Sequence, residues 1–176
     1  MRILIIAATL LAIAGCSKEK DVEPPAELAE FDASLRIERV WSAGVGGDDE
    51  ILRLGLGLAA VGEHVYAAGR GGEVAAFALA TGRPVWRTQT RAPLSGGTGA
   101  DAGLVVVGSS EGDVIALAAG DGAVRWRVRV NGEVLAGPAV SERIVVVRTV
   151  DGRLRGLAAA DGRELWVHEE QVPRLS

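Results

Sequence analysis

The chain is poor in the residues on which most catalytic and metal sites depend. Its 176 residues include one cysteine, Cys16, and two histidines, His64 and His168. A single cysteine excludes a disulfide within the chain, and the two histidines lack the spacing of metal ligands. The sequence contains no P-loop, nucleophile elbow or HExxH motif. These absences weigh against an enzyme or a metalloprotein.

An excess of basic residues is also missing. Lys and Arg total 19 against 23 Asp and Glu, a formal net charge of −4. The densest basic run, residues 125–130 (RWRVRV), alternates arginine with apolar residues, as expected of a strand with one buried and one solvated face. We therefore predict that the chain does not bind nucleic acid.

Long apolar runs are confined to the N-terminus. Arg2 precedes an apolar stretch over residues 3–14, and Gly15 and Cys16 follow it. The stretch is too short for a transmembrane helix and has the plan of a secretory signal. Its end, IAGC, resembles a bacterial lipobox, in which cleavage leaves the cysteine as a lipid-modified first residue. We predict a lipoprotein signal peptide over residues 1–15 and lipidation of Cys16; the alternative is an ordinary signal peptide with a coincidental cysteine.

The residues after the cysteine are predicted to form a tether. Residues 16–33 are charged, contain the pair Pro24-Pro25 and have few large apolar groups. Ser17 in the second position resembles lipoproteins that are sorted to the outer membrane. Because several lipid chains together give stable attachment, the folded domain itself need not touch the bilayer.

What the sequence does contain is a repeat of 40 residues. A tryptophan recurs at this interval at Trp86, Trp126 and Trp166. A glycine stands four residues before each of them, at Gly82, Gly122 and Gly162. The tryptophans close the phrases FALATGRPVW, LAAGDGAVRW and LAAADGRELW. A period of this length indicates a repeat architecture.

Each repeat is predicted to form four short strands. In the third repeat we place them at residues 137–140, 144–149, 153–158 and 164–169, separated by turns such as VDG and ADG. Four antiparallel strands every 40 residues are typical of β-propeller blades, and the 3.6-residue periodicity of a helical solenoid is absent. The predicted fold is all-β, with blades over residues 51–90, 91–130 and 131–170.

The tryptophans are predicted to hold neighbouring blades together by burying their rings between them; the alternative is ligand stacking. Trp41 lies in a similar phrase, 45 residues before Trp86, with the extra residues in the stretch GVGGDDE. We therefore expect residues 34–50 to hold a lone fourth strand, which completes the last blade of the ring, and its connection.

Three blades and one strand do not close a ring, because propellers typically have four to eight blades. We expect the chain to be the N-terminal portion of a longer propeller, in which residues 171–176 begin the next connection. The alternative is a short protein that closes its ring by pairing with a second copy.

The repeat also carries a family resemblance. Units of the form alaxxDGxxxW resemble the PQQ-type propeller repeat. Combined with the lipobox, the tether and the Trp41 strand, they resemble the BamB family of lipoprotein scaffolds of the outer-membrane β-barrel assembly (BAM) machinery. The phrase GPAVSERIVVVRTVDGRLRGLAAADGRELW and the tail QVPRLS are especially similar.

The resemblance implies an eight-bladed protein without catalytic residues, metal or cofactor, lipid-anchored in the outer membrane and facing the periplasm. It implies as partners the POTRA domains of BamA, other members of the BAM complex and unfolded outer-membrane proteins. In the family, a loop with the approximate sequence LSLRG after the third full blade contacts BamA. Leu175 and Ser176 match its beginning and are the candidate partner-binding residues; the alternative for Leu175 is packing at a blade junction.

Two other function classes stay open. One is a generic periplasmic binding propeller with PQQ-like repeats. The other is a fragment of a quinoprotein dehydrogenase, which would need a calcium site, a catalytic aspartate and a complete funnel for the quinone. The carboxylates of this chain fall mostly at turns, as Asp121, Asp151 and Asp161 do, where aspartate suits the backbone.

Overall fold

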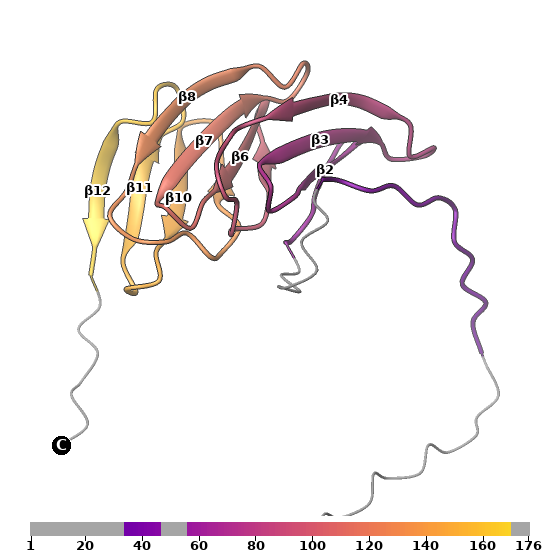
Figure 1. Ribbon diagram of the computed structural model, residues 1–176, viewed down its shortest axis with the longest axis horizontal. Helices are drawn as coiled ribbons and strands as arrows, with labels where there is room; N and C mark the ends of the chain where they lie inside the picture. Colours follow the sequence, from indigo (N-terminus) through magenta and orange to yellow (C-terminus); the bar gives the residue numbers. More distant parts are fainter. Residues whose placement is uncertain (1–33, 47–55, 170–176) are drawn as a thin grey trace, which may run out of the picture. The chain divides into compact units, whose positions relative to one another are not determined.

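The computed structural model of the chain describes residues 34–46 and 56–169, which contain twelve strands and no helix. The strands form three four-stranded antiparallel sheets, each in chain order (Figure 1). Blade 1 consists of β1 (Ala59–Val61), β2 (His64–Ala68), β3 (Glu73–Ala78) and β4 (Pro84–Gln89). Blade 2 consists of β5 (Gly99–Asp101), β6 (Leu104–Gly108), β7 (Asp113–Ala118) and β8 (Val124–Arg129). Blade 3 consists of β9 (Ala139–Val140), β10 (Ile144–Arg148), β11 (Leu154–Ala158) and β12 (Glu164–His168). The predicted all-β class with four-stranded blades is confirmed.

The three blades share a local irregularity as well as a topology. The pairing of the third and fourth strands shifts by one residue at the same repeat position, after Ala76, Ala116 and Gly156. In each blade this residue is the cross-strand partner of the repeated tryptophan. A β-bulge increases the local twist of a strand pair, so each tryptophan stands where its sheet twists most strongly.

The turn before each fourth strand needs glycine. Gly82, Gly122 and Gly162 have φ angles of +67°, +72° and +75°, in the left-handed region. The residue before the glycine closes the turn with its side chain: the Oδ1 atoms of Asp121 and Asp161 accept the backbone N–H two residues on, at 2.9 and 3.0 Å. These aspartates are turn residues, as the sequence predicted.

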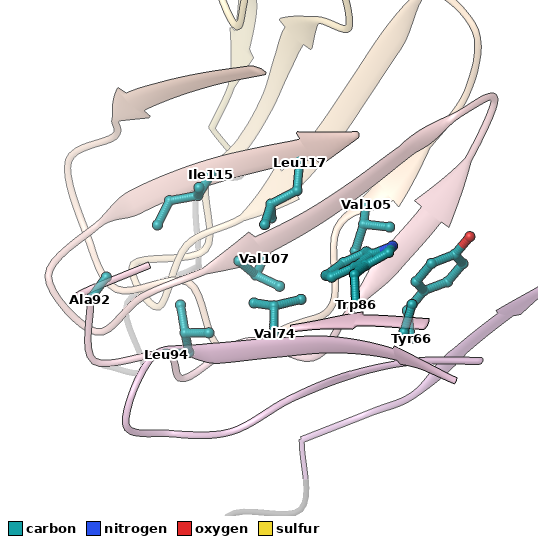
Figure 2. Close-up of a cluster of buried hydrophobic side chains, with 10 residues drawn as sticks. Tyr66, Val74, Trp86, Ala92, Leu94, Val105, Val107, Ile115 and Leu117 are labelled. Atoms are coloured by element: carbon teal, nitrogen blue, oxygen red, sulfur yellow. The ribbon is translucent and has the colours of Figure 1, made fainter. Parts of the chain in front are cut away.

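The hydrophobic core lies between the blades. One cluster of buried side chains joins blades 1 and 2 (Figure 2), and its larger members are Tyr66, Val74, Trp86, Leu94, Val105, Val107, Ile115 and Leu117. A second cluster joins blades 2 and 3, and its larger members are Val106, Val114, Trp126, Val134, Val145, Val147 and Leu157. Each blade is therefore stabilised chiefly by the faces that it shares with its neighbours.

The contact between blades 1 and 2 is built on Trp86. Its indole lies against Gly122 in the turn of blade 2, where an added Cβ would stand 2.4 Å from Cε3 of the ring. The indole Nε1–H donates a hydrogen bond to the Ala119 carbonyl at 2.8 Å. Glycine is therefore required twice at this turn, for its positive φ and for the space that the ring occupies. We call this combination the Trp–Gly contact.

Blades 2 and 3 are joined in the same way. Trp126 lies against Gly162, where an added Cβ would be 2.6 Å from Cε3, and Nε1–H donates to the Ala159 carbonyl at 2.8 Å. The exposed fractions of Trp86 and Trp126 are 9% and 8%. Trp166 is 40% exposed and lies against Gly156 of its own blade.

Trp41 makes a third Trp–Gly contact without a strand. Residues 34–46 contain no strand, and residues 47–50 lie outside the described residues. The lone strand predicted over residues 34–50 was expected to pair with the last blade of the ring, and it stays a prediction. A strand requires a paired neighbour, and no described strand pairs with this segment. Side-chain contacts provide the attachment to blade 1. Nε1–H of Trp41 donates to the Leu79 carbonyl at 2.7 Å, its ring lies against Gly82, and the Arg87 guanidinium donates to the Gly44 carbonyl at 3.1 Å.

Gly122→Ala should destabilise the protein more than Gly152→Ala. Both glycines have positive φ, +72° and +84°, so alanine costs about 1–2 kcal/mol of backbone strain at either position. Only at Gly122 does the new methyl group also meet Trp86, which adds about 1–3 kcal/mol of overpacking. Urea unfolding followed by tryptophan fluorescence measures both free energies of unfolding. Equal losses would show that the Trp–Gly contact has room for a methyl group.

Ala102→Gly should stabilise the protein. Ala102 has a φ of +48°, whereas the corresponding turn of blade 1 has Gly62 with a φ of +59°. Removing the strained Cβ should raise the free energy of unfolding by up to about 1 kcal/mol, less the added entropy of the unfolded chain. Ala100→Gly, two residues earlier in β5, is the control and should lower it by about 0.5–1 kcal/mol. A lower melting temperature for Ala102→Gly would contradict the assignment of strain.

Candidate functional site

The candidate partner-binding residues Leu175 and Ser176, and the candidate lipidation site Cys16, lie outside the described residues and stay predictions. The 40-residue register nevertheless gives Leu175 two described counterparts. These are Ser95, in the connection before blade 2, and Leu135, in the connection before blade 3. The environments of Ser95 and Leu135 show what surrounds this repeat position.

The connection before blade 2 is buried and held by hydrogen bonds. Leu94 has no exposed surface, and Ser95 is 4% exposed. The backbone N–H groups of Ser95 and Gly96 both donate to the Gly108 carbonyl, at 3.0 and 3.2 Å. The hydroxyl of Ser95 donates to the Val134 carbonyl at 2.9 Å. Ser95 is therefore covered by the next connection along the chain.

The connection before blade 3 begins in the same way and then differs. Val134 is fully buried, its N–H donates to the Ser109 carbonyl at 3.1 Å, and its side chain lies against Gly108. Leu135, the next residue, is 49% exposed, because no described residue covers it as Val134 covers Ser95. The repeat position of Leu175 is thus buried in one described copy and exposed in the other.

An open pocket of about 160 Å³ lies beside Leu135. Its lining consists of Leu135, Ala136, Arg148, Thr149 and Val150. Val150 is 62% exposed, and Arg148 is also exposed. We call these five residues the blade 3 surface. It presents apolar groups beside a cation, a combination that suits a protein partner rather than bond-making chemistry.

The blade 3 surface was not predicted from the sequence. The sequence feature that indicates it is that three of its residues differ in type from their counterparts in blade 2. Leu135 replaces Ser95, Arg148 replaces Gly108, and Val150 replaces Ser110. Each change puts a larger side chain where blade 2 has a small one.

A network of polar groups fixes the hairpin beneath this surface. The Thr149 hydroxyl donates to Asp151, and the Arg153 guanidinium bonds both Asp151 and Glu169. The hydrogen bond from Thr149, followed by the backbone and guanidinium groups of Arg153, holds the pKa of Asp151 below its ordinary value. Glu169, and then Asp151, raise the pKa of Arg153. The turn that contains Val150 is therefore held in place by hydrogen bonds and ion pairs.

The other described polar groups form no metal-binding cluster. Among residues 34–46 and 56–169, no three His, Cys, Asp or Glu side chains stand close enough to hold a metal ion. His64 lies in β2 of blade 1 and His168 in β12 of blade 3. In the described part of the chain, no helix is long and apolar enough to cross a membrane.

Comparisons with known proteins agree with this architecture. The family described as "Outer membrane protein assembly factor BamB" matches residues 38–93 and 70–176. A protein of that name from Burkholderia pseudomallei is 40% identical over 104 residues, which are 58% of this chain and 26% of that protein. Its namesake from Pseudomonas aeruginosa is 42% identical over 106 residues, 59% of this chain and 28% of that protein.

A solved structure shows the same likeness. The crystal structure of BamB from Moraxella catarrhalis superposes with a TM-score of 0.62 at 30% identity, covering 73% of this chain and 40% of that chain. The chain spans about a quarter of the length of the curated relatives that it matches, 26% and 28% in the two cases above. The family match takes in every described blade together with the Trp41 segment, and the chain belongs to the BamB family of outer-membrane protein assembly factors.

Proposed function

We propose that this chain is part of a non-catalytic scaffold of the BAM complex that aids the folding and insertion of outer-membrane β-barrel proteins. The observation that carries the proposal is the family match over residues 38–176, which coincides with the blades. Its curated relatives are named outer membrane protein assembly factors. An exposed apolar surface beside a cation, with no metal-binding cluster among the described residues, supports a function in binding.

The proposed partners are BamA, through its POTRA domains, other members of the BAM complex and unfolded outer-membrane proteins. We place the contact with BamA at Leu175 and Ser176. The exposure of Leu135 at the same repeat position supports this, since a large exposed apolar side chain is a suitable partner anchor. The burial of Ser95 supports the alternative, in which Leu175 packs at a blade junction.

The proposed location is the periplasmic side of the outer membrane. Cys16 carries the lipid, and residues 16–33 form the tether that separates the lipid from the blades. The predicted blades at 51–90, 91–130 and 131–170 enclose the strands β1–β4, β5–β8 and β9–β12 respectively. We further propose that the complete ring has eight blades, as the family resemblance implies.

Leu175→Ala in the full-length protein should weaken its capture by the periplasmic part of BamA about fivefold or more, because truncating an anchor side chain typically removes over 1 kcal/mol. Leu165→Ala is the matched control, since it removes an exposed leucine side chain that lies outside the blade 3 surface. It should retain binding. A pull-down titration measures both, and melting temperatures show that the variants are folded. Undiminished capture of Leu175→Ala would remove this residue from the contact.

Cys16→Ser should abolish lipid attachment, because the acceptor thiol is lost. In a Gram-negative host supplied with radiolabelled palmitate, the unaltered protein should carry the label and fractionate with the outer membrane. Cys16→Ser should lose both properties. Ser17→Asp should keep the label but move to the inner membrane, and Ser17→Ala should change neither. Label on the Cys16→Ser variant would overturn the assignment.

A further inference from the structure

The two junctions between complete blades share the Trp–Gly contact but differ in their other hydrogen bonds. We call the contact of blades 1 and 2 the first junction, and that of blades 2 and 3 the second. Both bury an apolar cluster of similar composition. Both also have a buried connection residue, Leu94 or Val134, whose N–H donates to a carbonyl of the preceding blade. The difference between the junctions lies at their outer and inner edges.

At the outer edge, two side chains cross the first junction. The hydroxyl of Thr88 donates to the Gly122 carbonyl at 2.8 Å. The guanidinium of Arg127 donates in the opposite direction, to the Thr90 carbonyl. Together these bonds join the fourth strands of blades 1 and 2 on both sides of the tryptophan.

Neither outer bond can form at the second junction. The register places Val128 where blade 1 has Thr88, and Val167 where blade 2 has Arg127. Valine has no hydrogen-bonding group in its side chain. Apart from the hydrogen bond of Trp126 to the Ala159 carbonyl, the outer edge of the second junction therefore depends on apolar contact, such as that between Val128 and Gly162.

The inner edge shows the same loss. At the first junction, the N–H of Thr98, just before β5, donates to the Gly57 carbonyl at 2.9 Å. At the second junction the corresponding residue is Pro138, which has no N–H to donate. Three hydrogen bonds that cross the first junction are thus chemically impossible at the second. One bond crosses only the second junction, from the Ser95 hydroxyl to the Val134 carbonyl, because the residue one repeat before Ser95 is a glycine without a side-chain donor. The net difference is two hydrogen bonds.

Blade 3 lacks an arginine at the position of Arg127 but has one on its third strand. In blade 2, Arg127 on β8 pairs across the strands with Ile115 on β7. In blade 3 the two residue types are exchanged: Arg155 on β11 pairs with Val167 on β12. The cation has moved from the outer strand to the third strand, where Arg155 is only 8% exposed.

Arg155 is held within its own blade. Its Nη1 forms an ion pair with Glu164 at 2.6 Å, and Glu164 belongs to β12 of the same blade. Its Nε is buried without a hydrogen-bond partner among the described residues. A buried donor without a partner disfavours the closed junction, because the group would find water if the junction opened.

We propose that blade 3 (Ala139–His168) opens as a separate unit at the second junction, while blades 1 and 2 stay packed. In repeat proteins, stability divides into the units and the interfaces between neighbours, so the weaker interface opens first. Each missing hydrogen bond changes the opening equilibrium about fivefold, so a net loss of two makes the second junction open about 25-fold more often than the first. Opening exposes Trp126 and the apolar face of blade 2 around Val114. The inference is independent of the proposed function.

Hydrogen exchange of the full-length protein, followed by mass spectrometry of peptides, tests this proposal. Because a blade that loses the apolar face buried at its junction unfolds, the amides of β10 and β11 should exchange together, and faster than those of β6 and β7. Val128→Thr restores one outer bond without changing the side-chain shape. It should slow exchange in blade 3 about fivefold and leave blade 1 unchanged. The control is Val124→Thr on the same strand, an exposed position outside the apolar cluster of the second junction, which should change neither.

A second variant tests the exchanged arginine. Arg155→Ile combined with Val167→Arg gives blade 3 the pattern of blade 2, and should slow exchange in blade 3 at least as much as Val128→Thr. Conversely, Thr88→Val should speed opening at the first junction about fivefold. Equal exchange of blades 2 and 3 in the unaltered protein would overturn the proposal. So would restored bonds that leave the exchange of blade 3 unchanged.

Discussion

The structure depends on the fit of one aromatic ring against a turn that has no side chain. The indoles of Trp86 and Trp126 occupy the space that a Cβ would fill in the turn of the next blade, and each indole N–H donates to a carbonyl of the same turn. The ring excludes every residue except glycine, and the positive φ of the turn favours glycine independently. Because one residue meets both demands, the distance and orientation between blades are set at a single point. The apolar clusters then fill the space that this contact defines.

Most of the fold could be predicted because its determinants recur. The columns of tryptophan and glycine gave the blades, and the alternation of RWRVRV gave the two faces of β8, where Trp126 is buried and its arginine neighbours are exposed. The segment around Trp41 has no strand over residues 34–46, for a physical reason. Its sequence resembles a fourth strand, but a strand is a property of two segments. The side-chain contact of Trp41 is local to blade 1 and forms without backbone pairing.

The candidate site was less accessible from the sequence. Leu175 was found through a family resemblance, whereas the blade 3 surface consists of residues that break the repeat. A single difference between repeats, such as Arg148 in place of Gly108, does not indicate a binding surface by itself, since surface residues vary freely. The structure shows that Arg148 lies beside Leu135 and Val150, so that the three differences together form one surface. The opposite exposures of Ser95 and Leu135 could not be predicted either, because they depend on what the next connection covers.

The Trp–Gly contact also affects how such a chain can gain or lose repeats in evolution. Each 40-residue unit carries the ring near its end and the receiving glycine four residues before it, so every unit brings both halves of the joint. A gene segment that encodes one unit could therefore be duplicated or deleted whole, and the units on either side would still match. Divergence can then proceed at the edges of each joint, as between Thr88 and Val128, while the joint itself is inherited intact.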